Sequence, residues 1–392
     1  MGIKLMLRLF SLMAAVCVML LQVPLEAKAA ETARKEVAMS FTAKSAYLME
    51  QDTGKELFAQ NETQKLAPAS LTKLMDLLLI LEAVEEGQLT MDQNLTCSAY
   101  AKTMGGSEIW LKEGEQMTVE ELLKALIVAS ANDAAVVFAE KLAFTEQGFV
   151  DMMNRKAQEM KLVNTQYKNC TGFDEEGHYT CAKDVAVIAR ELMNRYSEQI
   201  IPFSTIWMDS LRGGETELVN TNRLVRFYEG TTGLKTGTTD NAGHCLCATA
   251  TRGELSLIGV IMGCKTSQTR FEESKQLLDF GFTNFTRYRP ENVEKTLEPV
   301  KVHRGIPETV IPKILQMPQA VIRREEAEKA EIKLNIFSDL TAPLEKGQEI
   351  GKAELWMDGK ILASQPVTAA EKVEELTWLR SMGILLRGLL LG

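Results

Sequence analysis

Histidine is scarce in this sequence of 392 residues, and the motifs of several large enzyme classes are missing. The three histidines are His178, His244 and His303, so a mechanism that needs a histidine cluster has few candidates. The zinc pattern HExxH, a Walker-type glycine loop and the GxSxG nucleophile turn do not occur. Cysteine spacings typical of metal sites are missing too. The sequence therefore predicts neither a metal site nor a cofactor.

Positive charge is also in deficit. The 44 Lys and Arg residues against 53 Asp and Glu give a formal net charge of −9, which repels nucleic acid. With 45% hydrophobic and 25% charged residues, the composition argues against a disordered chain and against a multi-span membrane protein. At roughly 150 residues per domain, the length predicts two or three domains. We expect no nucleic-acid partner, and the sequence leaves the oligomeric state open.

Residues 1–29 have the pattern of an export signal. Lys4 and Arg8 come before an apolar stretch at 9–23, and Ala-Lys-Ala at 27–29 is a small-x-small cleavage site. The alternative is a transmembrane anchor, but the apolar stretch is short for a span of about 20 residues. We expect residues 1–29 to be removed and the mature protein to be exported.

Six cysteines remain after that cleavage. Export permits disulfides, but the sequence does not give their pairing. Cys245 and Cys247 are two positions apart in an apolar stretch, so on a strand they share one face and cannot readily bridge each other. We expect both side chains to pack in the hydrophobic core as small apolar residues.

Residues 30–286 alternate between strand-like and helix-like patterns. Apolar residues at spacings of three and four predict a long helix that Gly87 ends, and Thr118 opens a capping box for another. We expect an α/β (α+β) domain in which helices flank an antiparallel sheet. Its predicted elements are a hairpin of residues 46–49 and 57–59, helices over 71–84, 118–127 and 133–142, and strands at 245–250 and 255–262.

Two further segments follow. Residues 287–370 contain short alternating stretches such as 331–336 between turn signals, which predicts a small β-rich domain with strands wetted on one face. Residues 371–392 predict an amphipathic helix with a broad leucine face, Trp378 and two arginines. The alternative is a helix packed on the protein's own core. We expect this helix to place the protein on the outer face of the cytoplasmic membrane.

Three short motifs occur in order along the chain. Ser70-Leu71-Thr72-Lys73 lies at the start of the long helix, Ser130-Ala131-Asn132 lies between the next two helices, and Lys235-Thr236-Gly237 directly precedes a strand pair. A Ser-x-x-Lys alone arises by chance about once in a chain of this length. The order of the three motifs, their predicted structural contexts and the export signal are consistent with one another. The combination resembles the signature of penicillin-binding proteins and serine β-lactamases.

The first and third motifs predict an activated serine beside a cationic strand. A serine hydroxyl needs a base to become a nucleophile. Residues three apart on a helix have Cβ atoms about 5–6 Å apart, so Lys73 reaches Ser70 as general base when burial and a cationic neighbour deprotonate its amine. Lys235 is a candidate for that neighbour and attracts a substrate carboxylate. We expect Thr236 and Gly237 to bind substrate with it.

The remaining predicted roles concern the oxyanion and the leaving group. The backbone N–H of Ser70, at the positive end of the helix, and the backbone N–H of Thr238 are the expected oxyanion donors. We expect Ser130 to carry a proton between Lys73 and the departing amine, and the Asn132 amide to hold the substrate backbone. The alternative is an N-cap serine beside a solvated lysine.

Over about residues 40–285 the chain resembles low-molecular-mass penicillin-binding proteins that act as serine-type D-alanyl-D-alanine carboxypeptidases. The resemblance implies that a peptidoglycan stem peptide acylates Ser70, that the last D-alanine leaves, and that water then hydrolyses the acyl-enzyme. It also implies that β-lactam antibiotics acylate the same serine and leave slowly. Besides the three motifs, the similar stretches are 68–75, 105–107, 130–134, 220–224, 233–239 and 242–246.

The same resemblance implies that Arg223 and Arg270 help to receive the terminal carboxylate. The alternative for each is a surface ion pair at a sheet edge. Some members of the family carry histidine where Thr238 stands, and threonine keeps the backbone N–H, so we expect no loss of function.

Three other functions remain as alternatives. One is a serine β-lactamase, whose deacylating glutamate pattern has only a near match at 159–164, off by one position. Another is a DD-endopeptidase, which cuts cross-links. The third is a non-catalytic, penicillin-sensing wall-binding protein, against which the intact Ser70, Lys73 and Lys235 argue.

Overall fold

The computed structural model describes residues 39–291, 293 and 297–382. The predicted export signal at 1–29 and residues 383–392 of the predicted terminal helix lie outside the described residues.

A five-stranded antiparallel sheet in the order β2-β1-β9-β8-β7 organises the first part of the chain. The predicted hairpin and the predicted strand pair are confirmed as β1/β2 and β8/β9. Because β7 is an edge strand, one of its sides is left open to the segments that build the site. The strands are β1 (Ser45–Glu50), β2 (Glu56–Gln60), β7 (Thr231–Thr239), β8 (Gly243–Arg252) and β9 (Leu255–Cys264).

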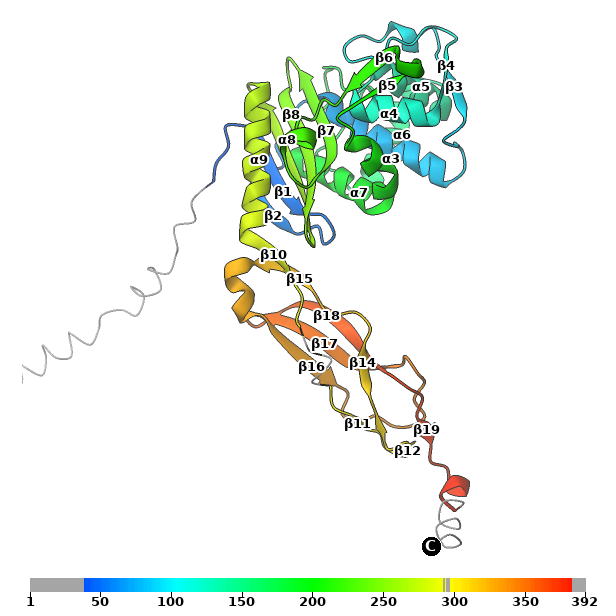
Figure 1. The fold of residues 1–392 in the computed structure, drawn as a ribbon, viewed down its shortest axis with the longest axis vertical. Helices are drawn as coiled ribbons and strands as arrows, with labels where there is room; N and C mark the ends of the chain where they lie inside the picture. The colour runs from blue at the N-terminus through cyan, green and yellow to red at the C-terminus, as the bar shows by residue number, and fades with distance from the viewer. Residues whose placement is uncertain (1–38, 292, 294–296, 383–392) are drawn as a thin grey trace, which may run out of the picture. The chain divides into compact units, whose positions relative to one another are not determined.

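Helices cover both faces of this sheet, with α9 on one side and a helical cluster on the other (Figure 1). The three predicted helices are confirmed as α3, α4 and α5, and α4 has the full capping box between Thr118 and Glu121. The helices are α3 (Lys73–Glu85), α4 (Val119–Val128), α5 (Asn132–Ala143), α6 (Glu146–Glu159), α7 (Ala182–Ser204), α8 (Leu224–Phe227) and α9 (Ser267–Asn284). Shorter pieces are η1 (Ala69–Thr72), η2 (Ala101–Thr103), η3 (Arg212–Gly214), and the ribbons β3 (Asn94–Thr96)/β4 (Gln116–Thr118) and β5 (Met208–Leu211)/β6 (Thr216–Val219).

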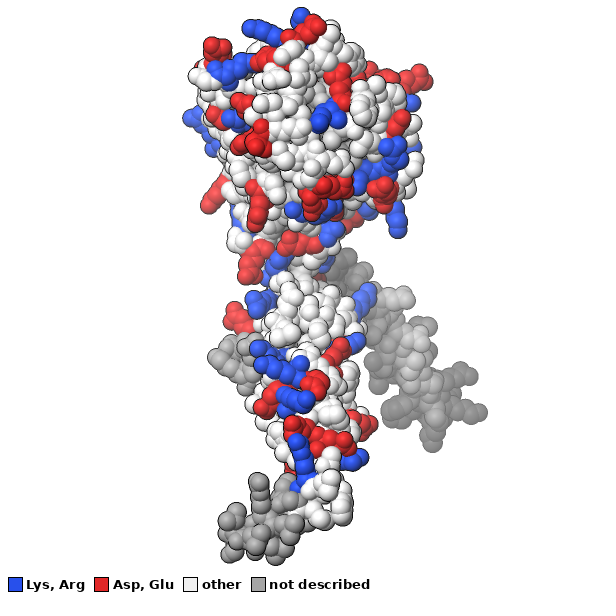
Figure 2. Space-filling model, turned by 90° about the vertical axis from the view of Figure 1, so that its right-hand side faces the viewer, with Lys and Arg blue, Asp and Glu red and all other residues white. Residues whose placement is uncertain are grey.

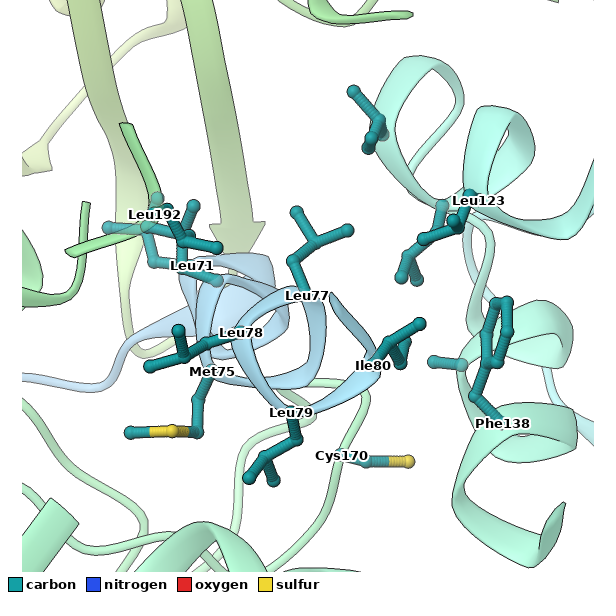
Figure 3. Close-up of a cluster of buried hydrophobic side chains, with 14 of the residues drawn as sticks. Leu71, Met75, Leu77, Leu78, Leu79, Ile80, Leu123, Phe138, Cys170 and Leu192 are labelled. Atoms are coloured by element: carbon teal, nitrogen blue, oxygen red, sulfur yellow. The ribbon is translucent and has the colours of Figure 1, made fainter. Parts of the chain in front are cut away.

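Helix α3 runs through the centre of the hydrophobic core. Its apolar side chains leave the axis in all directions, toward Leu123 and Phe138 on one side and Leu192 on another (Figure 3). A helix that is apolar all round must be buried all round, and every residue from Lys73 to Leu81 is buried. The rigid environment of α3 fixes the residues at its N-terminal end.

The second part of the chain is rich in β-structure, as predicted. Its main sheet has the order β14-β18-β17-β16, and β16 alternates between exposed and half-buried residues. Its buried residues form a cluster of their own, from Val293 to Val373. The elements are β10 (Phe285–Tyr288), β11 (Val300–Lys301), β12 (Gly305–Ile306), β13 (Thr309–Val310), β14 (Pro312–Ile314), β15 (Ala320–Arg323), η5 (Arg324–Lys329), β16 (Glu331–Ile336), β17 (Glu349–Met357), β18 (Lys360–Ala369) and β19 (Glu374–Glu375).

The terminal helix was predicted to begin at 371, but residues 371–377 are not helical and helix appears only at 378–382. Val373 is buried in the hydrophobic cluster of the β-rich part and β19 pairs with β12, so this stretch belongs to the β-structure. In the helical segment, Trp378 and Leu379 are 73% and 75% exposed, among the most exposed large apolar side chains of the described residues. Across the described ranges, no helix combines the length and the apolar character that crossing a bilayer requires. On the face shown in Figure 2, acidic and basic side chains are interspersed and neither sign forms a continuous field.

Candidate active site

Ser70 lies in the 3₁₀ turn η1 immediately before α3. We expected the long helix to start at Ser70, but regular α-helix begins only at Lys73. Ala69 has a left-handed φ of 50°, and the Thr72 hydroxyl donates to the Ala69 carbonyl over 2.8 Å. A side chain that takes a backbone acceptor in this way favours a tight turn over an α-helix. Ser70 is thereby held at the positive end of α3.

Lys73 is fully buried and points back toward Ser70. Its Nζ donates to Ser70 Oγ over 3.1 Å, to Asn132 Oδ1 over 2.6 Å and to the Thr171 carbonyl over 2.6 Å. Burial lowers the pKa of this amine to about 8, against the opposing charges of Asp76, Cys170 and Asp133. A lysine with such a pKa is partly neutral near pH 7 and accepts a proton readily.

The Ser-Ala-Asn motif brings two side chains to the same place. The Asn132 amide accepts from Lys73 through Oδ1 and donates through Nδ2 to the Gly105 carbonyl over 2.7 Å. Ser130 has a left-handed φ of 63°, and its buried Oγ has no hydrogen-bond partner among the described residues. A buried unpaired hydroxyl at a strained position indicates a functional site rather than a structural one.

The Lys-Thr-Gly motif lies inside edge strand β7, directly before the strand pair β8/β9, as expected. Lys235 is 1% exposed, and burial, together with the charges of Lys73 and Arg270, holds the pKa of its amine well below its usual range. Gly237 packs against the nucleophile turn, where an added Cβ would lie 3.1 Å from the Ser70 nitrogen. The strand and the nucleophile turn therefore touch directly, which favours glycine at this position.

Arg270 and Arg223 lie beside this strand but differ in burial. Arg270 is in the first turn of α9, where its guanidinium donates to the Gly237 carbonyl over 3.3 Å and to Thr238 Oγ1 over 3.2 Å. Burial lowers its pKa to about 10. Arg223 is exposed, and it stacks on the same ring of Phe271 that Arg270 contacts. Neither arginine has the simple surface ion pair that was the alternative.

Sequence reasoning missed the segment between α6 and α7. Besides the Thr171 carbonyl, it contributes Gly172, where an added Cβ would lie 2.0 Å from the Ala69 carbonyl oxygen. Asp174 of this segment accepts from Thr239 at the end of β7 over 2.6 Å. A backbone carbonyl and a close-packed glycine carry no recognisable sequence motif. Within the described ranges, no three His, Cys, Asp or Glu side chains converge as metal ligands.

The site joins Ser70, Lys73, Ser130 and Asn132 to strand β7, which is the arrangement expected of an acylating serine enzyme. The family model described as D-alanyl-D-alanine carboxypeptidase matches residues 29–266, more than half of the chain. The chain belongs to this family. A second model, the C-terminal domain of penicillin-binding protein 5, matches residues 292–375.

Individual family members are similar to this chain over most of their own length. The D-alanyl-D-alanine carboxypeptidase DacF of Bacillus subtilis is 40% identical over 375 residues, which are 93% of this chain and 96% of DacF. The crystal structure of penicillin-binding protein 5 from Haemophilus influenzae has a TM-score of 0.71 at 30% identity and covers 86% of this chain and 99% of its own. The ampicillin-bound penicillin-binding protein D2 of Listeria monocytogenes has a TM-score of 0.55 at 28% identity and covers 62% of this chain and 98% of its own.

These comparisons decide between the functional classes raised by the sequence. The chain is a serine-type carboxypeptidase of the penicillin-binding fold, an α+β domain followed by a β-rich one. The near match to a β-lactamase glutamate, Glu159, ends α6 with its side chain 66% exposed and paired to Lys156. Lys156 in turn pairs with Glu82, in the C-terminal half of α3 and three turns from Ser70. Glu159 is therefore not placed to activate water at the nucleophile.

Proposed function

We propose that the mature protein removes the terminal D-alanine from peptidoglycan stem pentapeptides through an acyl-enzyme at Ser70. The observation that carries the proposal is the 3.1 Å contact between Lys73 Nζ and Ser70 Oγ, made by an amine whose pKa burial lowers to about 8. A neutral amine beside a serine is a base poised to take the hydroxyl proton. The same chemistry opens a β-lactam ring, and β-lactams are therefore proposed as acylating inhibitors.

In the acylation step Ser70 Oγ attacks the carbonyl carbon of the penultimate D-alanine while its proton moves to Lys73 Nζ. The carbonyl oxygen becomes negative, and the backbone N–H groups of Ser70 and Thr238 are the proposed donors to it. The position of Ser70 at the positive end of α3 and the packing of Gly237 against its nitrogen support this assignment.

Collapse of the tetrahedral intermediate breaks the C–N bond, and the departing amine takes up a proton. We assign that delivery to Ser130, which gives its hydroxyl proton to the amine and receives from Lys73 the proton taken from Ser70. The Ser130 hydroxyl is buried, has no hydrogen-bond partner among the described residues, and belongs to the segment that leads into Asn132 and the Lys73 contact. Water then attacks the ester at Ser70, with Lys73 again as base, and releases the shortened peptide.

Substrate binding is assigned to the groups around β7. A stem peptide ends in a carboxylate, and cationic side chains that are partly desolvated bind such a group strongly. Asn132 has a second amide hydrogen beyond the one given to Gly105, which is available to a substrate carbonyl. The proposed binding residues are Asn132, Lys235, Thr236, Gly237, Thr238, Arg223 and Arg270.

We further propose how the rest of the chain serves this site. Residues 1–29 direct export, 30–286 form the catalytic domain, 287–377 form a β-rich spacer, and the terminal helix that starts at 378 lies in the outer interface of the cytoplasmic membrane. The matches to separate family models and the separate hydrophobic cluster after residue 292 support the division into domains. The exposed Trp378 and Leu379 support the membrane contact.

The test uses residues 30–392, incubated with a pentapeptide that ends in D-Ala-D-Ala or with a fluorescent penicillin. D-Alanine release and a stable adduct at Ser70 are expected, and Ser70→Ala should remove both while leaving the thermal unfolding transition in place. Thr72→Ser is a matched control, because serine keeps the hydroxyl group at this position next to the site. Turnover in the Ser70→Ala protein would show that the proposal is wrong. Fast release of the penicillin would instead identify a β-lactamase.

A further inference from the structure

Asp76 is a buried carboxyl group for which the proposed mechanism has no use. It lies one helical turn after Lys73 on α3, in a stretch whose other members from Leu74 to Ala83 are almost all apolar. Its exposure is 0%, and neither of its oxygens has a hydrogen-bond partner among the residues that the structure describes. Buried carboxyl groups are nearly always hydrogen-bonded or ion-paired, so an unpaired one inside the central helix requires an explanation.

Helix α3 offers no packing reason for an acid at this position. The neighbouring side chains on α3 point into apolar surroundings on all sides (Figure 3). An uncharged or apolar residue would fit such a core at lower cost. What distinguishes the position is its place on the helix that begins at Lys73, one turn deeper than the base.

Titratable groups that interact with Asp76 come from several elements around it. Lys73 precedes it on α3, Lys235 approaches from β7, and Glu146 lies at the start of α6. Tyr167 and Cys170 face it from the segment between α6 and α7. Lys73 is also within the electrostatic reach of Asp133 on α5, but the Asp133 carboxylate is occupied by the backbone N–H groups of Ile109 and Leu111.

We propose that Asp76 is a positioning residue that sets the protonation state of Lys73 as its buried counter-group. The inference rests on the proposed function, because it assumes that Lys73 is the base for Ser70. Asp76 touches neither substrate nor Ser70, and its effect passes through the amine of Lys73. It is the acidic member of a buried group with two lysines, Lys73 and Lys235, one on each side of the nucleophile turn.

The direction of the effect follows from charge. Burial raises the pKa of the Asp76 carboxyl well above its usual range and lowers that of Lys73, and each charge partly offsets the shift of the other. When the carboxylate is present, it stabilises the ammonium form of Lys73. Without the carboxylate, Lys73 therefore gives up its proton at a lower pH. Lys73 and Asp76 titrate as a coupled pair. The acid limb of the pH–rate profile for acylation therefore reports the pKa of the pair and not that of Lys73 alone.

The experiment compares residues 30–392 with the Asp76→Asn variant, which has nearly the same shape and no charge. The second-order rate of Ser70 acylation by a fluorescent penicillin is measured from pH 5 to pH 9. In Asp76→Asn the acid limb is expected to move to lower pH by about one unit, the usual size of an effect from one opposite charge. Glu86→Gln removes an exposed carboxylate at the end of the same helix and should leave the limb in place.

Two further results keep the test decisive. Asp76→Ala also removes the charge, so it should shift the limb in the same direction if Asp76→Asn fails to fold. An unshifted limb in a folded, charge-free variant would overturn the inference, while acylation of the wild-type protein at Ser70 would leave the proposed function intact. If the wild-type protein is not acylated at Ser70, the proposed function itself is wrong.

Discussion

The Oγ1 of Thr72 lies 2.9 Å from Nε2 of His178, directly behind the nucleophile turn. The other ring nitrogen of His178 accepts from the Lys168 N–H over 3.2 Å, so Nε2 carries the hydrogen and donates to Thr72. The Thr72 hydroxyl in turn donates a hydrogen bond to the carbonyl of Ala69, the residue before Ser70. A buried neutral imidazole thus supports the turn that holds Ser70, and it does so without taking part in the chemistry.

His178 should make the protein less stable as the solution is acidified. Burial lowers the pKa of His178 from 6.5 to about 4. Between these values the unfolded chain binds the proton and the folded chain does not, so stability falls as pH falls from about 6.5 to 4. The free energy of unfolding should drop by about 2 kcal/mol between pH 7 and pH 5 from this residue.

Urea unfolding of wild type and His178→Asn at both pH values measures this contribution. The variant is less stable at pH 7 because it loses the imidazole contacts, but its further loss on going to pH 5 should be smaller by about 2 kcal/mol. An identical pH dependence in the two proteins would mean that His178 is not the titrating group.

Lys73 should govern the pH dependence of acylation. The neutral amine is the active form and its pKa is about 8, so the acylation rate should rise with pH and reach half its limit near pH 8. Lys73→Arg keeps the charge but cannot lose a proton, and it should reduce acylation by about 10²–10⁴-fold at every pH, the usual size of general-base catalysis. Stopped-flow labelling with a fluorescent penicillin gives both profiles. A rate independent of pH between 6 and 9 would contradict the assignment.

Arg287 on β10 should contribute strongly to stability through Glu50. The Glu50 side chain is 0% exposed, and its Oε1 lies 2.6 Å from Arg287 Nη2. Among the described residues, Arg287→Ala leaves this buried carboxylate with only the Thr53 donors, so we expect a loss of about 3 kcal/mol in the free energy of unfolding. Adding Glu50→Gln to the Arg287→Ala variant removes the unpaired charge and should restore part of that loss. Additive effects in this double-mutant cycle would show that the pair is not coupled.

The sequence predicted the elements whose signals are local. The three-residue spacing of Ser70 and Lys73 placed one side chain within reach of the other, and the capping box at Thr118 marked the start of α4 correctly. The alternation at 331–336 indicated β16 with its wet face. Each of these depends on a single turn or a single strand, which is the range over which periodicity and capping act.

Features that depend on distant segments were not predictable in the same way. Lys-Thr-Gly lies directly before the strand pair, as expected, but the packing of Gly237 against Ala69 and Ser70 joins segments that are far apart in the sequence. The Thr171 carbonyl binds Lys73 across almost a hundred residues of sequence, and any residue type has a carbonyl to offer. Asp76 was hidden because the helix was identified by its apolar positions alone, so an acid among them drew no attention.

The terminal helix should control binding to membranes. Trp378 and Leu379 expose 73% and 75% of their surface, and Arg380 lies next to them, a combination suited to an anionic membrane interface. Residues 30–392 should sediment with vesicles that contain phosphatidylglycerol, whereas residues 30–377, which keep Val373 and β19, should stay in the supernatant and retain the acylation rate. Trp378→Ala combined with Leu379→Ala should weaken binding, while Phe337→Ala removes a half-exposed aromatic on the β-rich part and should leave it unchanged. If residues 30–377 still bind the vesicles, the contact lies elsewhere in the chain.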